Sequence, residues 1–224
     1  MAAPPRLVVF DAIETLFSLE PVRLELRQIG VGDRALETWF ARLLRDAFAL
    51  TAAGGYAGFR PLAEGALRSV LADHDVPATD EVLDRVFAAF STLPIHADGP
   101  PALEAVVRAG IPVHILTNGT GDTTEQLLAN AGVSHLVDAV LTVHDVGRWK
   151  PAPEPYLHAA GAGGVDPSEV ALVAVHGWDI CGARAAGLRT GWCSRLEHHL
   201  SPALGPADAT GDSLVAVVRS LLER

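Results

Sequence analysis

The sequence predicts an α/β protein with a doubly wound parallel sheet and an inserted helical domain. Short, continuous apolar runs recur along most of the chain, and stretches with helical periodicity lie between them. Parallel strands need crossover connections about as long as a helix, so this alternation favours a parallel sheet. One long stretch near the N-terminus has helical patterns only. The length of 224 residues permits one large domain or one domain that carries an insertion.

Strands are expected where apolar residues follow one another without alternation, as in strands covered by helices on both faces. The first strand is residues 7–10, and the others are 112–116, 139–143, 170–175 and, more weakly, 189–193. Helices are expected between and after these strands, at 101–109, 121–131, 154–160, 179–186 and 213–223. The Pro- and Gly-rich pieces are expected to be loops, at 98–101 and 161–166.

The stretch without strand signals is residues 16–93, and helices are expected there at 35–49, 62–72 and 79–90. It lies between the first and second strands, so it leaves the sheet at the carboxyl end of the first strand. Ligands bind at that end in sheets of this kind. We therefore expect a helical cap domain at 16–93 above a core domain formed by residues 1–15 and 94–224.

The charge and the apolar runs argue against two classes of partner. The 17 Lys and Arg against 27 Asp and Glu give a net charge of -10, which opposes binding to nucleic acid and to anionic lipid. No apolar run approaches the roughly 20 residues of a membrane span, and residues 1–6 lack the apolar region of a secretory signal. We expect a cytoplasmic protein that binds neither nucleic acid nor membranes. Cys181 and Cys193 are expected to be buried free thiols.

Polar residues follow four of the expected strands, at the edge of the sheet where ligands bind. Asp11 follows the first strand, Thr117-Asn118-Gly119 the second, Lys150-Pro151 the third and Asp179 the fourth. These motifs, in this order, resemble those of the haloacid dehalogenase superfamily, and the resemblance covers essentially the whole chain. It implies a Rossmann-like core with the helical insertion as a cap.

The resemblance also implies a role for each motif, and each role has a chemical reason. Asp11 would be the nucleophile, because a carboxylate can form an ester that water then hydrolyses. Lys150 would balance the negative charge of Asp11 and of an anionic substrate. Thr117 and Asn118 would bind a substrate carboxylate or phosphate. Thr15 would hold Asp11 through its hydroxyl.

Two departures separate the sequence from the phosphatases of that superfamily. Those enzymes carry a second Asp two residues after the nucleophile, where this chain has Ile13, which cannot protonate a leaving group. Their last motif usually supplies two acids, but Val175 stands at the earlier position here. Loss of acidic ligands weakens the Mg²⁺ binding on which phosphoryl transfer depends. We expect no metal site and no cofactor, with Mg²⁺ only under a phosphatase alternative, and Ile13 at the substrate pocket.

The dehalogenase branch of the superfamily is the most similar. Its members also lack the second Asp, and their last motif has the pattern Trp178-Asp179 followed by Gly182-Ala183. By this resemblance, Asp179 helps to orient the lysine and the hydrolytic water. His176 replaces an Asn of that branch and is a candidate base, since imidazole accepts a proton near neutral pH.

Two positions near the cap match the branch less well. The branch uses a cap arginine to bind the halide, and Arg42 and Arg45 lie in the right region but not in the right frame. Both are therefore candidates for substrate binding. Glu14 stands where many relatives have Gly, which places a carboxylate near the cap hinge.

The leading prediction is a metal-independent 2-haloacid dehalogenase, in which Asp11 displaces halide from a short 2-haloacid and water cleaves the resulting ester. The expected partner is a small anionic substrate, and the resemblance adds a homodimer, a common assembly in this branch. Two alternatives stay open: a Mg²⁺-dependent small-molecule phosphatase with an atypical motif, and a catalytically degenerate relative kept as a binding protein. The departures at Ile13, Glu14 and His176 motivate the second alternative.

Overall fold

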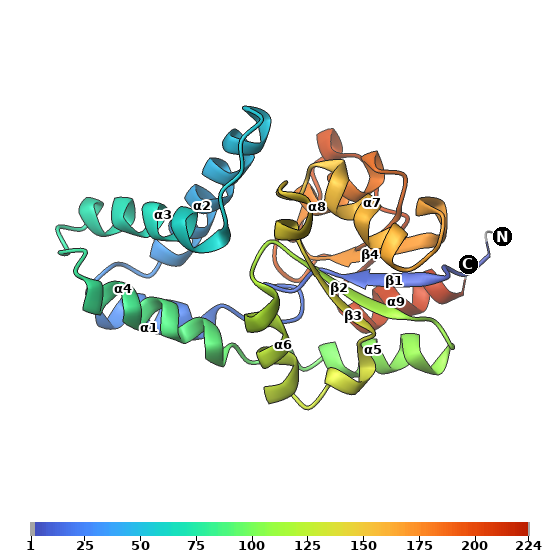
Figure 1. Cartoon of the computed structure of the whole chain (residues 1–224). Coiled ribbons are helices and arrows are strands. Elements are labelled where there is room, and N and C mark those ends of the chain that lie inside the picture. Colours follow the sequence, from blue (N-terminus) through green and yellow to red (C-terminus); the bar gives the residue numbers. More distant parts are fainter. Residues whose placement is uncertain (1–2, 224) are drawn as a thin grey trace.

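The chain folds around a six-stranded parallel sheet (Figure 1). The structure is a computed structural model and describes residues 3–223. The strands lie in the order β3-β2-β1-β4-β5-β6, with the bounds β1 Leu7–Phe10, β2 Val113–Thr117, β3 Ala139–Thr142, β4 Val170–Ala174, β5 Arg189–Cys193 and β6 Ala209–Gly211. The chain adds β2 and β3 on one side of β1 and the later strands on the other. This doubly wound parallel sheet confirms the predicted fold class.

Helices cover both faces of the sheet, which explains why the strands are apolar at nearly every position. Side chains alternate between the faces: Val8 and Phe10 of β1 join one core, while Leu7 and Val9 join the other. The first core lies against α5 (Gly99–Arg108), α6 (Gly121–Asn130) and α9 (Leu214–Leu222). The second lies against α7 (Pro153–Ala162) and α8 (Gly177–Ala185), on the opposite side of the sheet in Figure 1. Short 3-10 helices occupy Ser134–Leu136, Val143–Val146, Pro167–Glu169 and Pro202–Leu204.

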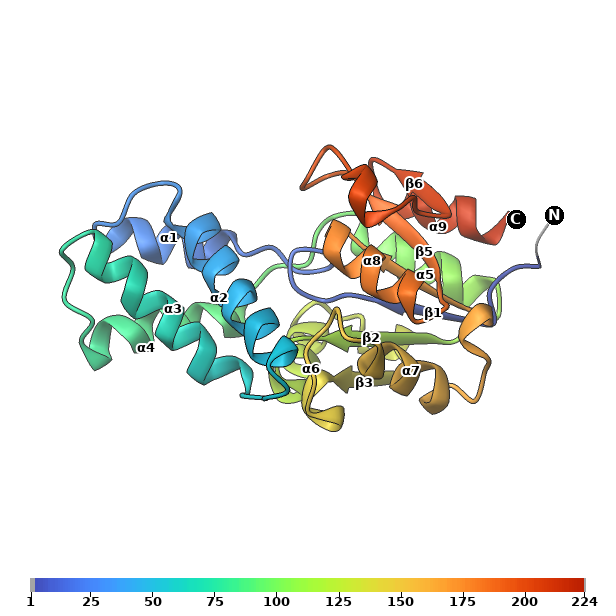
Figure 2. The same cartoon turned by 90° about the horizontal axis from the view of Figure 1, so that it is seen from above.

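Four helices lie between β1 and β2 in the chain and form a separate body beyond one end of the sheet (Figures 1 and 2). They are α1 Glu20–Gln28, α2 Ala35–Ala52, α3 Phe59–Asp73 and α4 Asp80–Ala88, followed by a 3-10 helix at Ala89–Thr92. The chain enters and leaves this body at neighbouring points, because Phe17 makes β-bridges to both Ile13 and Ile95. Trp39 is fully buried inside the insertion, and its Nε1 donates to the Ala63 carbonyl at 2.8 Å. We propose that residues 16–93 act as a cap domain.

Two short elements were missing from the sequence prediction. Helix α1 is only nine residues long and buries only Val22 and Leu26. Strand β6 has three residues at the edge of the sheet, and only Ala209 among them is buried. Neither element buries enough apolar surface to leave a recognisable pattern in the sequence.

Two loop predictions are corrected by the structure. Helix α5 already begins at Gly99 and carries Pro in its first turn, where a missing backbone N–H breaks no helical hydrogen bond. Helix α7 continues through Gly161 to Ala162 before the chain turns. Gly and Pro residues thus form the first turn of α5, and Gly161 lies in the last turn of α7.

Two other sequence predictions concern the cysteines and the membrane-spanning segments. Cys181 and Cys193 were predicted to be buried free thiols; both are free, but only Cys193 is buried and Cys181 is half-buried. Within residues 3–223, no helix combines the length and the apolar character needed to cross a membrane.

Candidate active site

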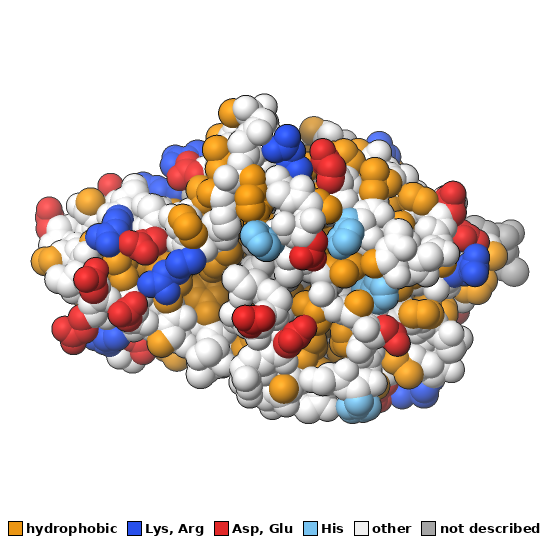
Figure 3. Space-filling view, in the orientation of Figure 1, with side chains coloured by type: hydrophobic (Ala, Val, Ile, Leu, Met, Phe, Trp, Pro, Cys, Tyr) orange, Lys and Arg blue, Asp and Glu red, His pale blue; other side chains and the backbone are white. Residues whose placement is uncertain are grey.

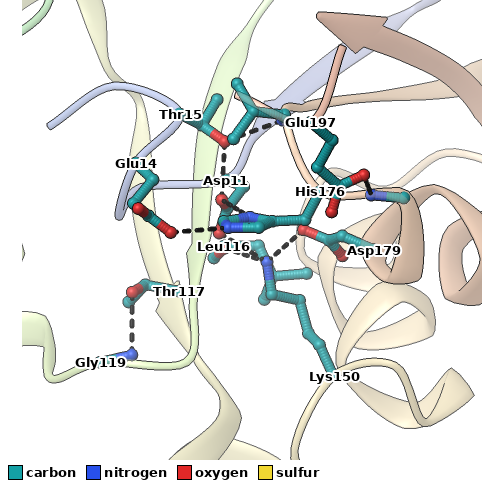
Figure 4. Close-up of polar contacts among 12 residues, drawn as sticks. Asp11, Glu14, Thr15, Leu116, Thr117, Gly119, Lys150, His176, Asp179 and Glu197 are labelled. Carbon is teal, nitrogen blue, oxygen red and sulfur yellow. Dashed lines mark hydrogen bonds and ion pairs between the residues drawn. The ribbon is translucent and has the colours of Figure 1, made fainter. Parts of the chain in front are cut away.

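Asp11 stands at the carboxyl end of β1, in the middle of the sheet, and is almost completely buried. Its backbone N–H donates to the Val173 carbonyl at 3.1 Å, so the neighbouring strand fixes its position. The Thr15 hydroxyl donates to Asp11 Oδ2 at 2.7 Å and accepts from the Val175 N–H at 3.1 Å (Figure 4). Because a hydroxyl has a single proton, this arrangement directs the proton of Thr15 to the carboxylate.

Lys150 lies between two carboxylates at this end of the sheet (Figure 4). Its Nζ donates to Asp11 Oδ1 at 2.8 Å, to Asp179 Oδ2 at 2.6 Å and to the Leu116 carbonyl at 3.1 Å. An ammonium has three N–H donors, so all of them are used. Burial lowers the pKa of Lys150, but the two carboxylates outweigh burial and raise the pKa above its ordinary value. Lys150 is therefore a buried cation at neutral pH.

The same neighbours keep Asp11 ionised. Burial raises the pKa of Asp11, but the Lys150 ammonium and the His176 imidazole outweigh burial and hold the pKa well below its usual range. Only the ionised form of a carboxylate is a useful nucleophile. Asp11 therefore has the charge that the predicted reaction needs.

Asp179 is fully buried in the first turn of α8. The sequence predicted that this helix begins at residue 179, but it begins at Gly177 and His176 is the N-cap residue. The Asp179 carboxylate is thereby free to face Lys150. Burial raises the pKa of Asp179, and the Lys150 ammonium opposes that rise.

Tyr156 completes the contacts of Asp179, and the sequence analysis missed it. Its hydroxyl donates to Asp179 Oδ1 at 2.6 Å from helix α7. Burial and the nearby carboxylate raise the pKa of Tyr156 well above its ordinary value, so the hydroxyl keeps its proton. The one available signal was a tyrosine on a helix expected to cover the sheet, since a buried tyrosine hydroxyl needs a partner.

His176 lies on the other side of Asp11 and contacts Glu14. Its Nε2 is 3.0 Å from Glu14 Oε2, and its Nδ1 is 3.5 Å from Asp11 Oδ2. Burial lowers the pKa of His176, but the two carboxylates outweigh burial and raise the pKa to about 10. The predicted role as a base does not fit this environment, because an imidazole that is already protonated near neutral pH cannot accept another proton.

The Thr117-Asn118-Gly119 segment lies beside Asp11, as predicted from the strand order. Thr117 Oγ1 accepts from the Gly119 N–H at 2.9 Å, and Asn118 Oδ1 accepts from the Lys150 N–H at 3.1 Å. These two bonds hold the turn after β2 and connect it to the segment that carries Lys150. All three residues line the cavity that Asp11 faces.

That cavity has a volume of about 20 Å³, which is room for about one water molecule. The sheet contributes polar residues to it, and the inserted helices contribute the apolar side chains of Phe40, Leu43, Leu44 and Phe59. Ile13 also lines the cavity. Asp11 therefore lies between polar residues of the sheet domain and apolar side chains of the inserted helices.

The two candidate arginines of the insertion lie outside this cavity, which corrects the prediction. Arg42 donates to Ser69 and forms an ion pair with Asp73 on α3. Arg45 pairs with its neighbour Asp46 in an exposed position. Both lie on helix α2, but their side chains are held by neighbours away from Asp11. The sequence does not indicate which face of helix α2 points to Asp11. A prediction of the region alone was therefore insufficient to identify a residue that binds substrate.

Within residues 3–223, no group of three His, Cys, Asp or Glu side chains is arranged to hold a metal ion. Two carboxylates of the site, those of Asp11 and Asp179, both bind the Lys150 ammonium. That position between two acids is the place where a divalent cation would otherwise balance their charge. The donor set present here fits an ammonium and does not fit a Mg²⁺ ion, which prefers a near-octahedral shell of oxygen atoms.

Comparison with known proteins adds independent evidence. Residues 5–187 match the family model of the haloacid dehalogenase-like hydrolases. The chain is 30% identical to (S)-2-haloacid dehalogenase 4A of Burkholderia cepacia over 187 residues, which are 83% of this chain and 81% of the relative. It is also 31% identical to a phosphoserine phosphatase of Thermus thermophilus over 186 residues, which are 82% of this chain and 73% of the relative.

Solved structures agree with the same assignment. The crystal structure of an L-2-haloacid dehalogenase matches with a TM-score of 0.93 and 29% identity, over 99% of this chain and 100% of the other. The L-2-haloacid dehalogenase of Xanthobacter autotrophicus, solved with chloropropionic acid covalently bound, matches with a TM-score of 0.85 and 25% identity, over 96% of this chain and 97% of the other.

Proposed function

The chain belongs to the haloacid dehalogenase-like hydrolase family, and on that premise we propose that it hydrolyses the carbon–halogen bond of a short 2-haloacid without a metal ion. The observation that carries the proposal is the position of Lys150. Its ammonium joins Asp11 to Asp179 and keeps an ionised carboxylate at the wall of a largely apolar cavity. Such a site suits attack on carbon, because a halide leaves as a stable anion and needs no proton.

The reaction has two steps in this proposal. An oxygen of Asp11 bonds to C2 of the substrate with inversion, the carbon–halogen bond breaks, and the electron pair leaves with the halide. Water then attacks the Asp11 carbonyl carbon, which returns the carboxylate and releases the 2-hydroxyacid and a proton. Thr15 holds the carboxylate for the first step, and Asp179 with Lys150 orients the water for the second.

The substrate carboxylate has a separate place in the proposal. Thr117 ends β2, and Asn118 and Gly119 follow it, at the wall of the cavity. A turn at this position offers backbone N–H groups and side-chain donors, which bind carboxylates. Ile13 and the apolar side chains of the insertion then surround the carbon chain.

Replacement of Asp11 tests the proposal directly. Asp11→Asn removes the nucleophile with almost no change of size, and we expect release of chloride from 2-chloropropionate to fall by at least about 10³-fold. Chloride release is measured with an ion-selective electrode. Asp33→Asn, at an exposed site, is the matched control and should keep full activity. Chloride release by Asp11→Asn at the wild-type rate would refute the mechanism.

The phosphatase alternative is tested on the same protein, because one relative is named a phosphoserine phosphatase. We expect little turnover of p-nitrophenyl phosphate, with or without added Mg²⁺, since Ile13 cannot protonate an alkoxide. EDTA should leave dehalogenation unchanged. Rapid, Mg²⁺-dependent phosphate release would favour the alternative, and absence of turnover with every substrate would favour a binding protein.

A further inference from the structure

The inserted helices supply no cation to the cavity beside Asp11, among the residues that the structure describes. Their side of the cavity is formed by the apolar side chains of Phe40, Leu43, Leu44 and Phe59. A halide that leaves carbon carries a full negative charge, and an apolar surface does not stabilise a buried charge. Within this cavity a cation that receives the halide can come only from the sheet side, because Arg60 of the insertion lines the adjoining cavity and is held over the Phe87 ring.

Two cationic side chains lie next to Asp11 on that side, Lys150 and His176. All three N–H donors of Lys150 are used, by two carboxylates and the Leu116 carbonyl. A further anion could reach Lys150 only by displacing one of these partners. Lys150 therefore sets the charge of Asp11 but is poorly placed to receive a halide.

His176 has a free donor in the same place. The residue is 5% exposed, its ring lines the cavity, and its Nδ1 has no hydrogen-bond partner. Its Nε2 is held by Glu14 at 3.0 Å. Trp178 stacks against the ring, with the centroids 5.1 Å apart and an angle of 27° between the planes. One ring nitrogen is thus fixed, and the other is directed to the nucleophile.

Glu14 has a left-handed backbone conformation, and its backbone N–H donates to the Phe17 carbonyl at 2.7 Å. Its φ angle is +64°, in the left-handed region that non-glycine residues rarely adopt. Strained residues of this kind cluster at functional sites, where the surrounding contacts hold them in place. The contact that the Glu14 side chain makes here is the ion pair with His176 (Figure 4).

We propose that His176 is the cation that receives the leaving halide, and that Glu14 is the positioning residue that holds its ring. The proposal rests on the proposed function and specifies which group of this chain balances the charge. As an Asp11 oxygen bonds to carbon, Asp11 becomes a neutral ester and the negative charge moves to the halide. His176 then exchanges one anionic neighbour for another, and no proton is transferred.

The test uses Asp11→Asn, because its neutral amide imitates the charge of the ester and cannot react. Bromide binding is measured by calorimetry at constant ionic strength. We expect Asp11→Asn to bind bromide at least about fivefold more tightly than the wild type, since a charge-assisted hydrogen bond to His176 becomes available. A second substitution, His176→Asn, should abolish that gain, and His135→Asn at an exposed site should leave it unchanged.

The outcome that overturns the proposal is bromide binding by the Asp11→Asn, His176→Asn double variant that equals binding by Asp11→Asn. Circular dichroism and thermal unfolding establish that each variant folds, and His176→Gln is the second replacement if His176→Asn does not. No turnover is needed for this measurement. A protein that binds bromide through His176 but releases no halide from any haloacid would contradict the proposed function and not the anion site.

The positioning role of Glu14 has its own readout. The protonation of the His176 ring is followed by ¹⁵N chemical shifts of the imidazole during a pH titration. We expect Glu14→Gln to move the titration to lower pH, because one of the two carboxylates that face the ring is lost, and Glu14→Asp to restore part of the shift. An unchanged titration in Glu14→Gln would remove Glu14 from the proposal.

Discussion

At the scale of single residues, three groups act on the Asp11 carboxylate in different ways. Thr15 donates one hydrogen bond and fixes the orientation of the carboxylate, while Lys150 and His176 balance its charge. A buried carboxylate without such partners would be protonated, because burial disfavours the charged form. These groups already hold the Asp11 carboxylate in its ionised form, as electrostatic preorganisation requires.

Tyr156 gives the first prediction at this scale. Tyr156→Phe removes the hydroxyl that donates to buried Asp179 Oδ1 and leaves that oxygen unsatisfied. We expect a loss of about 1–3 kcal/mol in the free energy of unfolding, together with slower hydrolysis of the ester intermediate. Chemical denaturation and mass spectrometry of the trapped ester measure the two effects. Tyr56→Phe, a half-buried hydroxyl 3.3 Å from His144, is the control and should change both far less.

The ion pairs of His176 give a prediction for the pH dependence of stability. The pKa of His176 is raised from 6.5 to about 10 in the folded protein, so its charged form stabilises the fold fully below pH 6.5. This contribution is lost as the pH rises through about 10. The difference in free energy of unfolding between the wild type and His176→Asn should therefore decrease steadily from about pH 6 to pH 10.

Urea denaturation across that pH range measures the difference. His135→Asn, which changes an exposed histidine, serves as the control and should give a difference that stays near zero. A difference that grows with pH would mean that His176 is neutral in the folded protein and would contradict the assigned charge.

The residues that could be predicted are those whose positions follow from the strand order. Asp11, Lys150 and Asp179 each follow a strand, and parallel strands bring their carboxyl ends to one edge of the sheet. The pairing of Glu14 with His176 could not be predicted in this way. It depends on a left-handed backbone at Glu14, and a glutamate gives no sequence signal for that conformation.

At the scale of helices and strands, close packing of α8 on the Lys150-Pro151 segment positions two of the charged groups. Gly182 lies in α8 where a Cβ atom would be 2.6 Å from Pro151 Cβ and 2.7 Å from the Pro151 carbonyl oxygen. The absence of a side chain therefore lets α8 approach the segment that carries Lys150. Motif patterns place a glycine here, but the distance that requires it is visible only in the structure.

Gly182→Ala is the prediction at this scale. The added methyl group has no space, so α8 and the Lys150-Pro151 segment must separate, with an expected loss of about 1–3 kcal/mol in stability and a large loss of activity. Gly65→Ala is the matched control: it lies on the exposed face of α3 with nothing within 4 Å of a new Cβ atom. That variant should gain about 0.5–1 kcal/mol. Thermal unfolding of both variants checks the pair, and equal effects would contradict the packing argument.

The elements themselves were predictable to the extent that they bury apolar residues in a pattern. The five longer strands and the helices between them have this pattern, whereas α1 and β6 bury too few side chains to show it. The same limit applies to the cap arginines. A helix was predicted at residues 35–49, but which of its side chains face another domain is decided by packing between parts that are distant in the sequence.

At the scale of the whole molecule, the insertion and the sheet close over the site. A single hydrophobic cluster extends from the sheet through the inserted helices. Beside the small cavity at Asp11 lies a wider one of about 220 Å³, whose lining includes Phe59, Phe87, Phe90 and the charged Arg60, and the two share Ile13 as a wall. Figure 3 shows hydrophobic side chains in the hollow between the insertion and the sheet domain. Because the inner cavity holds about one water molecule, a haloacid can enter only when the two parts separate.

The loop after α2 holds the closed arrangement, and its contacts give the last prediction. Arg148 Nη1 donates to the Gly54 carbonyl at 3.1 Å, and Trp149 Nε1 donates to the Ala57 carbonyl at 2.8 Å. Arg148→Ala removes one of these bonds and should favour the open form by about 0.5–1.5 kcal/mol. We expect faster amide hydrogen exchange at residues 53–58 and, because haloacid enters only the open form, a KM lowered by about twofold to tenfold. Arg108→Ala removes an equal charge from an exposed pair with Glu104 and should change neither, so equal exchange in the two variants would show that this loop does not control closure.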